Sequence, residues 1–382
     1  MKQTATFIST YTGDTSGVAS ALYELGGMTV MHDASGCNST YNTHDEPRWY
    51  DKDSLVFISG LAEIDAVTGN DEKLIADTVK TAKELHPRFI ALAGTPIPMM
   101  TGTDLTAVAR EIERRSGVPS FGFDTDGMHT YVRGASAALE AFVRRFLSEK
   151  PKTAALTVNL LGTTPLDFSV GGMLSGMKEA FETRGIRVLT GFSYDCDFES
   201  ALAMPAASVN VVVSSCGLAA AKAMRELFGM PYVVGAPFGE KLADSLALAV
   251  REAAADGVSR SVFAPSEDEG TLIVGEGVTA LSLAAALALE TARPVPKVAV
   301  ATDLCGLELP EGTVCATDED ELIPHFQKAR RIIADPLYRP LCPDGAAFIE
   351  NAHEAFSGRL FRRKIPDLAH DLAAFIQQNH LA

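Results

Sequence analysis

The sequence lacks several features that mark common classes of protein. It has no Cys-x-x-Cys spacing among its six cysteines, no apolar run long enough for a membrane helix, and no basic-then-apolar stretch after Met1. These absences argue against a disulfide framework, a transmembrane helix and a secretory signal peptide, respectively. We therefore expect a cytoplasmic protein whose cysteines are thiols or ligands.

Positive charge is also scarce. The chain has 33 Lys and Arg against 49 Asp and Glu, which gives a net charge of -16. Such a charge repels nucleic acid and anionic membranes, so we expect neither as a partner. Hydrophobic residues make up 47% of the sequence and charged residues 21%, which is typical of a folded globular protein.

Two widespread catalytic motifs are missing. No Gly-x-x-x-x-Gly-Lys-Ser/Thr loop is present, so there is no ATP site of that kind, and any ATP must be hydrolysed by another protein. The stretch Gly171–Gly176 begins a helix and does not form the strand-turn-helix of a hydrolase nucleophile.

One nucleotide-binding signal is present. Residues Gly275–Ala280 read Gly-x-Gly-x-x-Ala, follow an apolar strand and open a helix. Such turns bring backbone N–H groups close to a pyrophosphate. Glu276 inside the turn would repel phosphate, and the acidic residue expected downstream, Asp303, comes late. An NAD-dependent dehydrogenase therefore stays open as an alternative.

Short β-branched runs alternate with stretches of helical period, which predicts parallel sheets covered by helices. Polar segments at residues 150–152 and 266–270 divide this pattern, so we place domains at residues 1–150, 151–268 and 269–382. The predicted strands are 29–31, 55–58, 89–93, 120–123, 156–160, 187–189, 209–214, 232–235, 271–274 and 298–301. The predicted helices are 16–25, 71–85, 105–116, 134–147, 171–184, 218–228, 280–290 and 368–378.

A dense set of reactive side chains follows the first strand, between His32 and Trp49. In parallel α/β sheets, ligands bind beyond the carboxyl ends of the strands, so this loop lies where a site is expected. The alternative is a polar loop whose side chains cap helices and bond the backbone. The candidate catalytic groups in this loop are His32, Asp33, His44, Asp45 and Arg48.

Ordered motifs carry a resemblance to a known family. His32–Cys37 reads HDASGC, similar to the H-G-x-x-G-C motif of nitrogenase component 1 type oxidoreductases. Glu63–Leu74 and Thr95–Asp104 resemble two later motifs of the same family, E-x-D-x-V-x-G-G-x-x-x-L and T-C-x-x-x-x-I-G-D-D. Weaker matches continue through Val158–Gly162, Ala203–Asn210, Met230–Tyr232 and Pro237–Gly239.

The resemblance implies a fold, a cofactor and partners. The fold is three Rossmann-like, doubly wound parallel-sheet α/β domains around a central cleft. The cofactor is an iron-sulfur cluster shared across a subunit interface, with Cys37 as its metal ligand. The partners are a second copy or a homologous component 1 subunit, and a separate P-loop iron-sulfur reductase that supplies low-potential electrons. The candidate cofactor-binding residues are Gly36, Cys37, Tyr41, Thr95, His129 and His353.

The chain departs from the family at the cluster positions. The family's first cysteine segment aligns with Gly13–Val18, which has no cysteine, and Pro96 stands where a third cysteine is expected. A cluster commonly needs about four thiolates, with His or carboxylate sometimes substituting. The remaining ligands would therefore come from His32, Asp33, His44 or Asp45, or from a partner.

The substrate cannot be inferred from the sequence. A chain shorter than nitrogenase catalytic subunits argues against nitrogen fixation itself, and a non-catalytic scaffold for metal-cluster or tetrapyrrole assembly is the second alternative. Cys216 follows a strand at a site-like position, but a core thiol is the favoured interpretation. His353 either approaches a cofactor from the third domain or caps a helix.

Overall fold

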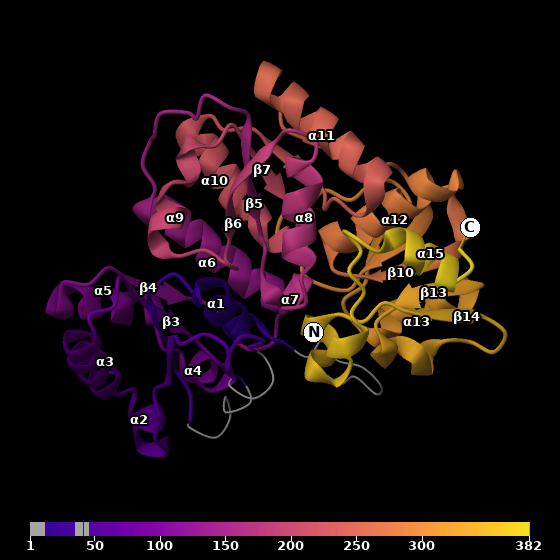
Figure 1. The fold of residues 1–382 in the computed structure, drawn as a ribbon. Helices are drawn as coiled ribbons and strands as arrows, with labels where there is room; N and C mark the ends of the chain where they lie inside the picture. The colour runs from indigo at the N-terminus through magenta and orange to yellow at the C-terminus, as the bar shows by residue number, and fades with distance from the viewer. Residues whose placement is uncertain (1–11, 35–40, 42–45, 382) are drawn as a thin grey trace.

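Three parallel sheets organise the chain in a computed structural model that describes residues 12–34, 41 and 46–381 (Figure 1). The first sheet has the order β2-β1-β3-β4, the second β6-β5-β7-β8-β9, and the third β12-β11-β10-β13-β14. Every strand pair within these sheets is parallel. The predicted fold class is confirmed.

The first sheet lies at the lower left of Figure 1. Its strands are β1 (Met28–Met31), β2 (Leu55–Ile58), β3 (Ile90–Ala93) and β4 (Ser120–Phe123). Its helices are α1 (Asp14–Leu22), α2 (Glu63–Thr68), α3 (Glu72–Leu85), α4 (Pro96–Thr101), α5 (Leu105–Ser116) and α6 (Tyr131–Phe146). The sequence pattern missed α2 and α4, because α2 has no buried residue and α4 buries only Pro98, so neither shows apolar periodicity.

The second sheet lies above the first. Its strands are β5 (Thr157–Leu161), β6 (Arg187–Phe192), β7 (Val209–Val212), β8 (Tyr232–Val234) and β9 (Arg260–Ser261). Its helices are α7 (Pro165–Phe168), α8 (Met173–Glu182), α9 (Phe198–Leu202), α10 (Leu218–Phe228) and α11 (Gly239–Asp256).

The third sheet contains β10 (Asp268–Gly275), β11 (Pro296–Val300), β12 (Val314–Cys315), β13 (Arg331–Ala334) and β14 (Ala347–Glu350). Its helices are α12 (Gly277–Thr291), α13 (Glu319–Lys328) and α14 (Glu354–Ser357), and the chain ends with α15 (Leu372–Gln378). Short 3₁₀ turns occupy Met204–Ala206, Ser215–Gly217, Pro336–Leu341, Gly358–Leu360 and Arg362–Lys364.

Several predicted boundaries differ from the structure, and two of them have identifiable causes. The acidic segment at residues 266–270 was expected to be a loop, but β10 already begins at Asp268, which is paired with Pro296 before a bulge. The last helix begins at Leu372 instead of residue 368. The reason is that the Asp367 carboxylate accepts the N–H groups of Ala369 and His370 at 3.2 Å, which forms a turn before the helix.

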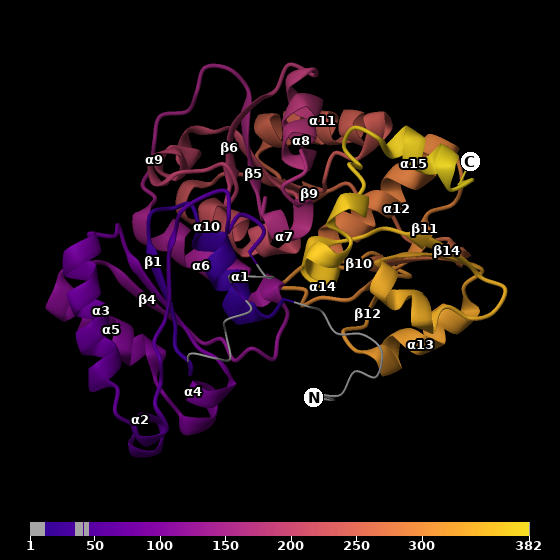
Figure 2. The same ribbon diagram turned by 60° about the horizontal axis from the view of Figure 1, so that its bottom comes forward.

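Helices α1 and α6 pack together at the centre of the molecule, between the first and second sheets (Figure 2). Two glycines allow this close approach. A Cβ atom built on Gly17 would lie 2.1 Å from the Tyr131 carbonyl oxygen, and one on Gly134 would lie 1.8 Å from that of Asp14. The two backbones are therefore in direct contact, which only glycine permits.

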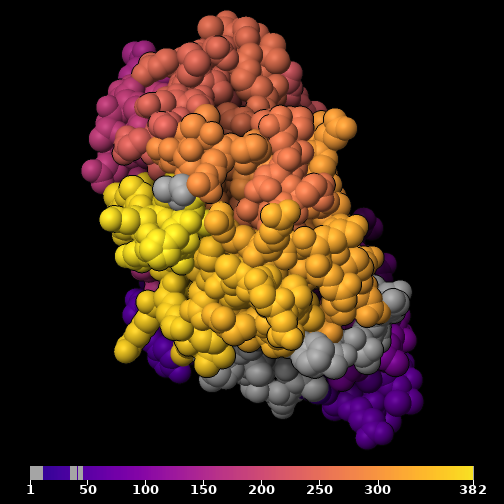
Figure 3. All heavy atoms as spheres, turned by 90° about the vertical axis from the view of Figure 1, so that its right-hand side faces the viewer, coloured from indigo at the N-terminus to yellow at the C-terminus, as the bar shows by residue number. Residues whose placement is uncertain are grey.

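One apolar core joins all three sheets. The buried side chains of Ala91 in β3, Val211 in β7 and Ile273 in β10 belong to the same cluster. The C-terminal segment adds to it, because Leu372 lies against Gly239 at the start of α11 and Phe375 belongs to the same cluster. Figure 3 shows the yellow C-terminal residues beside the orange and salmon ones on one face. Within the described ranges, no helix has the length and apolarity needed to cross a bilayer.

The α1–α6 contact predicts the effect of adding one methyl group. Gly134→Ala should destabilise the fold by about 1–3 kcal/mol or more, because the new Cβ meets backbone that cannot move aside. Urea unfolding followed by circular dichroism measures this change. Gly171→Ala is the matched control, since its Cβ would meet nothing within 4 Å. Equal stability of the two variants would contradict the account.

Candidate functional site

The predicted loop after β1 is described only in part. Gly36, Cys37, His44 and Asp45 lie outside the described residues, so their roles stay predictions. His32 and Asp33 lie at the carboxyl edge of the first sheet, where its strands end. The Thr95 hydroxyl donates to the His32 carbonyl at 3.0 Å, which brings three predicted site residues together.

His32 has the properties of a neutral imidazole. Its Nδ1 lies 2.8 Å from the Ser59 hydroxyl, and the side chain is buried. Burial lowers the pKa of His32, and the nearby Asp33 carboxylate only partly opposes this effect. A neutral imidazole is the form that binds metals, so His32 keeps its place as a candidate ligand.

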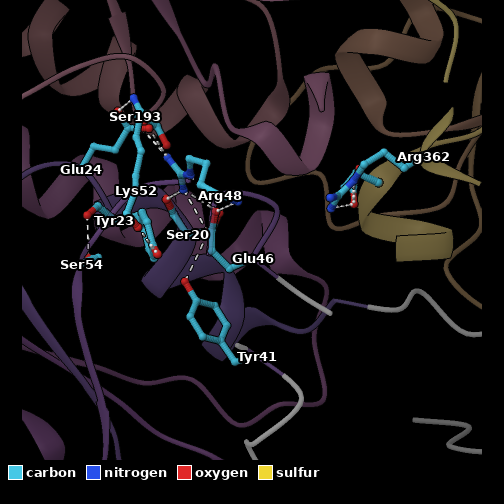
Figure 4. Close-up of polar contacts among 11 residues, drawn as sticks. Ser20, Tyr23, Glu24, Tyr41, Glu46, Arg48, Lys52, Ser54, Ser193 and Arg362 are labelled. Atoms are coloured by element: carbon cyan, nitrogen blue, oxygen red, sulfur yellow. Dashed lines mark hydrogen bonds and ion pairs between the residues drawn. The ribbon is translucent and has the colours of Figure 1, made fainter. Parts of the chain in front are cut away.

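Arg48 is fully enclosed by protein groups (Figure 4). Its guanidinium donates to Glu46 at 2.7 Å, to Glu24 at 2.8 Å and to the carbonyls of Ser20 and Ser193 at 2.7 and 3.1 Å. The side chain is only 1% exposed. This arrangement fits a residue that fixes the end of the 32–49 loop to α1 and to the second sheet's loops, and it leaves no donor free for a substrate.

Tyr41 belongs to the same network. Its hydroxyl donates to Glu46 at 3.3 Å, and its ring packs edge-on against Trp49. Burial raises the pKa of Tyr41 well above 10, and the Glu46 carboxylate adds to this shift. Tyr41 therefore positions the loop as a neutral phenol.

His129 lies in a second group, at the N-terminus of α1. Its ring and the carboxylates of Asp14 and Asp126 place one potential ligand atom each within 4.8 Å of one another. Asp14 accepts the N–H groups of Gly127, Thr15 and Asp126 at 2.7, 2.8 and 3.2 Å. Arg133 donates to the His129 ring from the next turn, so a cation already faces this group.

Gly13 and Pro96, the two positions where the family resemblance expects cysteines, lie beside this group. A Cβ on Gly13 would lie 3.5 Å from the Gly127 carbonyl oxygen, and a Cβ on Gly127 would lie 3.0 Å from Pro96 Cδ. Gly13 and Pro96 stand where the family resemblance expects cysteines. The local donors in the described part of the chain are therefore carboxylate oxygens and imidazole nitrogen, which favour harder metals than thiolate does.

The described cysteines do not form a thiolate cluster site. Burial raises the pKa of Cys196 to about 12 and that of Cys305 to about 11, and it raises the pKa of Cys216 well above 9. These residues are thiols in the core. Cys315 is exposed in β12, and Cys342 is half-buried in the connection between β13 and β14. A thiolate-bound cluster would therefore depend on Cys37 and on a partner.

A third group brings the three sheets' elements together around Asp167, a residue that the sequence reasoning missed, although it singled out His353 of the same group. The Tyr131 hydroxyl from α6 donates to one Asp167 oxygen, and the Thr164 hydroxyl donates to the other at 2.8 Å. His353 from the third unit places Nε2 3.6 Å from Asp167, with no hydrogen-bond partner. Burial, and then the Asp167 charge, raises the pKa of Tyr131 well above 10.

The Gly275–Ala280 turn does not fit a pyrophosphate. Glu276 accepts the N–H groups of Val278 at 3.1 Å and Thr279 at 2.9 Å, and that of Ser215 at 2.9 Å. The helix N–H groups that a phosphate would use are already bonded to this carboxylate. The turn is a capped helix start at the edge of a pocket, which disfavours the dehydrogenase alternative.

That pocket opens at the carboxyl edges of the second and third sheets. Its enclosed space is small, about 30 Å³, within a wider hollow of about 510 Å³ that includes space open to solvent. Its polar lining includes Asp167, Glu276, Asp335, Asn351 and His353, each from a segment that follows a strand. The signal that could have found these residues is their position directly after strands, because ligands bind at such edges.

Comparison with known proteins identifies the chain. Residues 16–272 match the sequence pattern that defines the family described as Nitrogenase component 1 type Oxidoreductase. The chain belongs to this family. The predicted resemblance is confirmed.

Individual relatives are distant. The chain is 27% identical over 219 residues to the nitrogenase iron-molybdenum cofactor biosynthesis protein NifE of Rippkaea orientalis, covering 55% of this chain and 45% of the relative. It is 28% identical over 191 residues to one of the subunits of light-independent protochlorophyllide reductase from Chlorobium luteolum, covering 46% and 35%. The matches thus span less than half of these relatives. The solved structure "Nitrogenase Cp1 at pH 5" superposes with a TM-score of 0.64 at 14% identity, covering 100% of this chain and 91% of the other, which shows a shared fold.

Asp14 gives a pH-dependent prediction. Burial raises its pKa from about 3.8 to about 6, so the folded protein holds this proton more tightly than the unfolded chain. Protonated Asp14 therefore stabilises the folded protein. This stabilisation is fully present below about pH 4 and is lost as the pH rises through 6. Asp14→Asn should therefore gain up to about 3 kcal/mol relative to the wild type between those pH values.

Urea unfolding of both proteins across this pH range measures the effect. Asp195→Asn is the matched control, because the Asp195 side chain is 66% exposed. A stability difference between Asp14→Asn and wild type that does not change with pH would contradict the assignment.

Proposed function

We propose that the protein is a nitrogenase-like component 1 subunit that accepts low-potential electrons from a separate ATP-hydrolysing iron-sulfur reductase. It uses them to reduce a small molecule held in the pocket between the second and third sheets. The observation that carries this proposal is the pocket itself, because it is walled by residues from the carboxyl edges of two sheets in a member of an oxidoreductase family. The absence of a P-loop in the sequence assigns ATP hydrolysis to the partner.

Electrons would enter through the first unit. Cys37 is the one cysteine at a family cluster position, and the described donors nearest to it along the chain are His32 and Asp33. Because the described residues supply no thiolate set, a cluster at this place requires ligands from a second copy or a homologous subunit. The proposal therefore includes assembly with such a subunit around Cys37.

An apolar surface on the first unit supports docking of the reductase. Val67 on α2 is 78% exposed and Met100 on α4 is 81% exposed, and these two helices contact each other. Glu63 and Asp65 lie beside them on α2. Acidic side chains beside an apolar surface favour a basic partner over a second copy of a chain with net charge -16. We therefore assign this face, the α2–α4 face, to the reductase.

A scaffold is the second candidate. Relatives named as iron-molybdenum cofactor biosynthesis protein NifE, from Rippkaea orientalis, Klebsiella pneumoniae and Nostoc, match this chain at 25–27% identity. A scaffold would hold a cofactor precursor without turning over electrons. Electron transfer therefore separates the two candidates.

The electron-acceptor role predicts a kinetic result. Anaerobic mixing with a P-loop iron-sulfur reductase, ATP and a low-potential donor should accelerate ATP-dependent reoxidation of the reductase when this protein is added. Absorbance of the reductase cluster follows the reaction, and omission of ATP is the control. Reoxidation no faster than with the reductase alone would remove the electron-acceptor role and favour the scaffold.

The assignment of the α2–α4 face to the reductase is tested by a double variant and a matched control. Val67→Ser and Met100→Ser together should weaken reductase binding by about tenfold, because apolar contacts at an interface centre carry much of the binding free energy. Leu248→Ser on α11 is the control, since Leu248 is 58% exposed on another face. Biolayer interferometry at fixed ionic strength measures both. Equal affinity of the two variants would move the docking site elsewhere.

A further inference from the structure

A second cavity lies between the second and third units. Its enclosed space is about 160 Å³, within a wider hollow of about 500 Å³ that includes space open to solvent. The enclosed part is larger than the 30 Å³ beside Asp167, and the two cavities share no lining residue. This second cavity therefore has room for a small molecule and is a separate place on the protein.

The cavity lies at the carboxyl ends of two short parallel strands. Val234 ends β8, Ser261 ends β9, and these two residues pair with each other. Helix α10 contributes Lys222 to the lining, and the segment of the third unit between β11 and β12 contributes Glu308. Ligands bind beyond the carboxyl ends of strands in parallel α/β sheets, so a ligand site is expected at this place.

Two opposite charges line the cavity without pairing. Among the residues that the structure describes, neither Lys222 nor Glu308 forms a salt bridge, and the Lys222 ammonium donates only to the Gly306 carbonyl, at 2.8 Å. Arg260, the other cation of the lining, is already paired with Asp256 at 2.6 Å. Opposite charges attract, so a molecule that carries both charges can pair with Lys222 and Glu308 at the same time.

The third unit holds the Lys222 ammonium at the cavity. Besides accepting its hydrogen bond, Gly306 lies so close that an added Cβ would be 3.0 Å from the Lys222 Nζ. Gly306 has a φ of +82°, which glycine adopts readily. An ammonium group has three N–H donors, so two remain for a ligand carboxylate. Holding the side chain in advance lowers the entropic cost of binding.

Hydroxyl groups add further donors to the lining. The Ser259 oxygen accepts the Tyr232 N–H at 3.0 Å and an N–H of Arg225. The Ser261 oxygen accepts the Phe263 N–H at 3.3 Å. Both serine hydroxyl hydrogens are thus available to another acceptor. Burial raises the pKa of Tyr232, so its phenol also stays a donor. These groups suit a carboxylate beside Lys222.

The remaining lining is apolar and aliphatic. The side chains of Leu218, Val234 and Leu307 are buried and face the same cavity. Apolar walls of this kind favour a hydrophobic body, because its burial removes apolar surface from water. The cavity thus combines a free cation, a free anion and an aliphatic wall.

We infer that this cavity binds a small aliphatic α-amino acid. The ligand carboxylate accepts hydrogen bonds from Lys222, the ligand ammonium donates to Glu308, and the side chain packs against Val234. The inference goes beyond the proposed function, because it adds a ligand site outside the pocket beside Asp167. Its test needs neither the reductase nor a cluster.

Three molecules of similar shape and different charge test the inference: L-leucine, 4-methylpentanoate, which lacks the ammonium group, and 3-methylbutylammonium, which lacks the carboxylate. Binding is read from the ¹³C-methyl NMR signals of Val234, assigned with Val234→Ile. Val250, buried in α11 outside the lining, reports nonspecific change. L-leucine should bind at least about tenfold more tightly than either other molecule, because each charge adds a charge-assisted hydrogen bond. Equal binding of a molecule with one charge, or unchanged Val234 signals in L-leucine, would overturn the inference.

Variants then assign each charge to its partner. Lys222→Met should weaken L-leucine binding about tenfold without weakening that of 3-methylbutylammonium, which has no carboxylate. Glu308→Gln should weaken L-leucine binding about tenfold without weakening that of 4-methylpentanoate. Both side chains are exposed, so these changes spare the fold. Lys73→Met and Glu199→Gln are the controls, because these side chains are 49% and 68% exposed outside the lining. L-leucine binding that survives both cavity variants, or is lost in a control, would contradict the inference.

Discussion

The buried carboxylate of Asp167 is the point on which the arrangement of the three units depends. It accepts a hydroxyl from Tyr131 of the first unit and one from Thr164 of its own unit, and it faces His353 of the third. Its side chain is fully buried. A carboxylate in this position is tolerated only when several donors converge on it, so the three units must meet in one geometry. The pocket beside Asp167 exists because of that geometry.

The contact between α1 and α6 also fixes how the first and second units meet. Gly17 and Gly134 allow the two helices to touch backbone to backbone, which places Tyr131 at the start of α6 against the second unit. Thr130, the preceding residue, donates to Asp303 of the third unit at 2.7 Å. One short segment therefore links the first sheet to both of the others.

The sequence predicted many of the elements that rest on continuous burial, although it missed β13 and α11. Strands such as Ile90–Ala93 are buried on both faces, and amphipathic helices such as α5 show a clear apolar stripe, so each has a local signature. Helices α2 and α4 lack one because they bury almost nothing. The acidic segment before β10 gave the wrong boundary, since its pairing with Pro296 is a long-range contact that no local pattern reveals.

The candidate site was predictable only in outline. His32, Asp33 and Thr95 lie near one another, because each follows a neighbouring parallel strand. Arg48 was singled out for its charge, but burial among Glu46 and Glu24 could not be foreseen from spacing. Asp167, Glu276 and Asp335 are far apart in sequence and share no motif, although Glu276 lies in the Gly275–Ala280 turn, so only the folded chain brings them to one pocket.

The central claim is that the molecule on which this protein acts is held in the pocket beside Asp167. A crystal structure of the protein isolated anaerobically from its own cells, with its natural ligand retained, tests it most directly. The account predicts density in the pocket, within hydrogen-bond distance of Asp167 or His353 and in contact with Phe238. A pocket filled by water alone, with the ligand bound instead at the loop that contains Cys37, would contradict it.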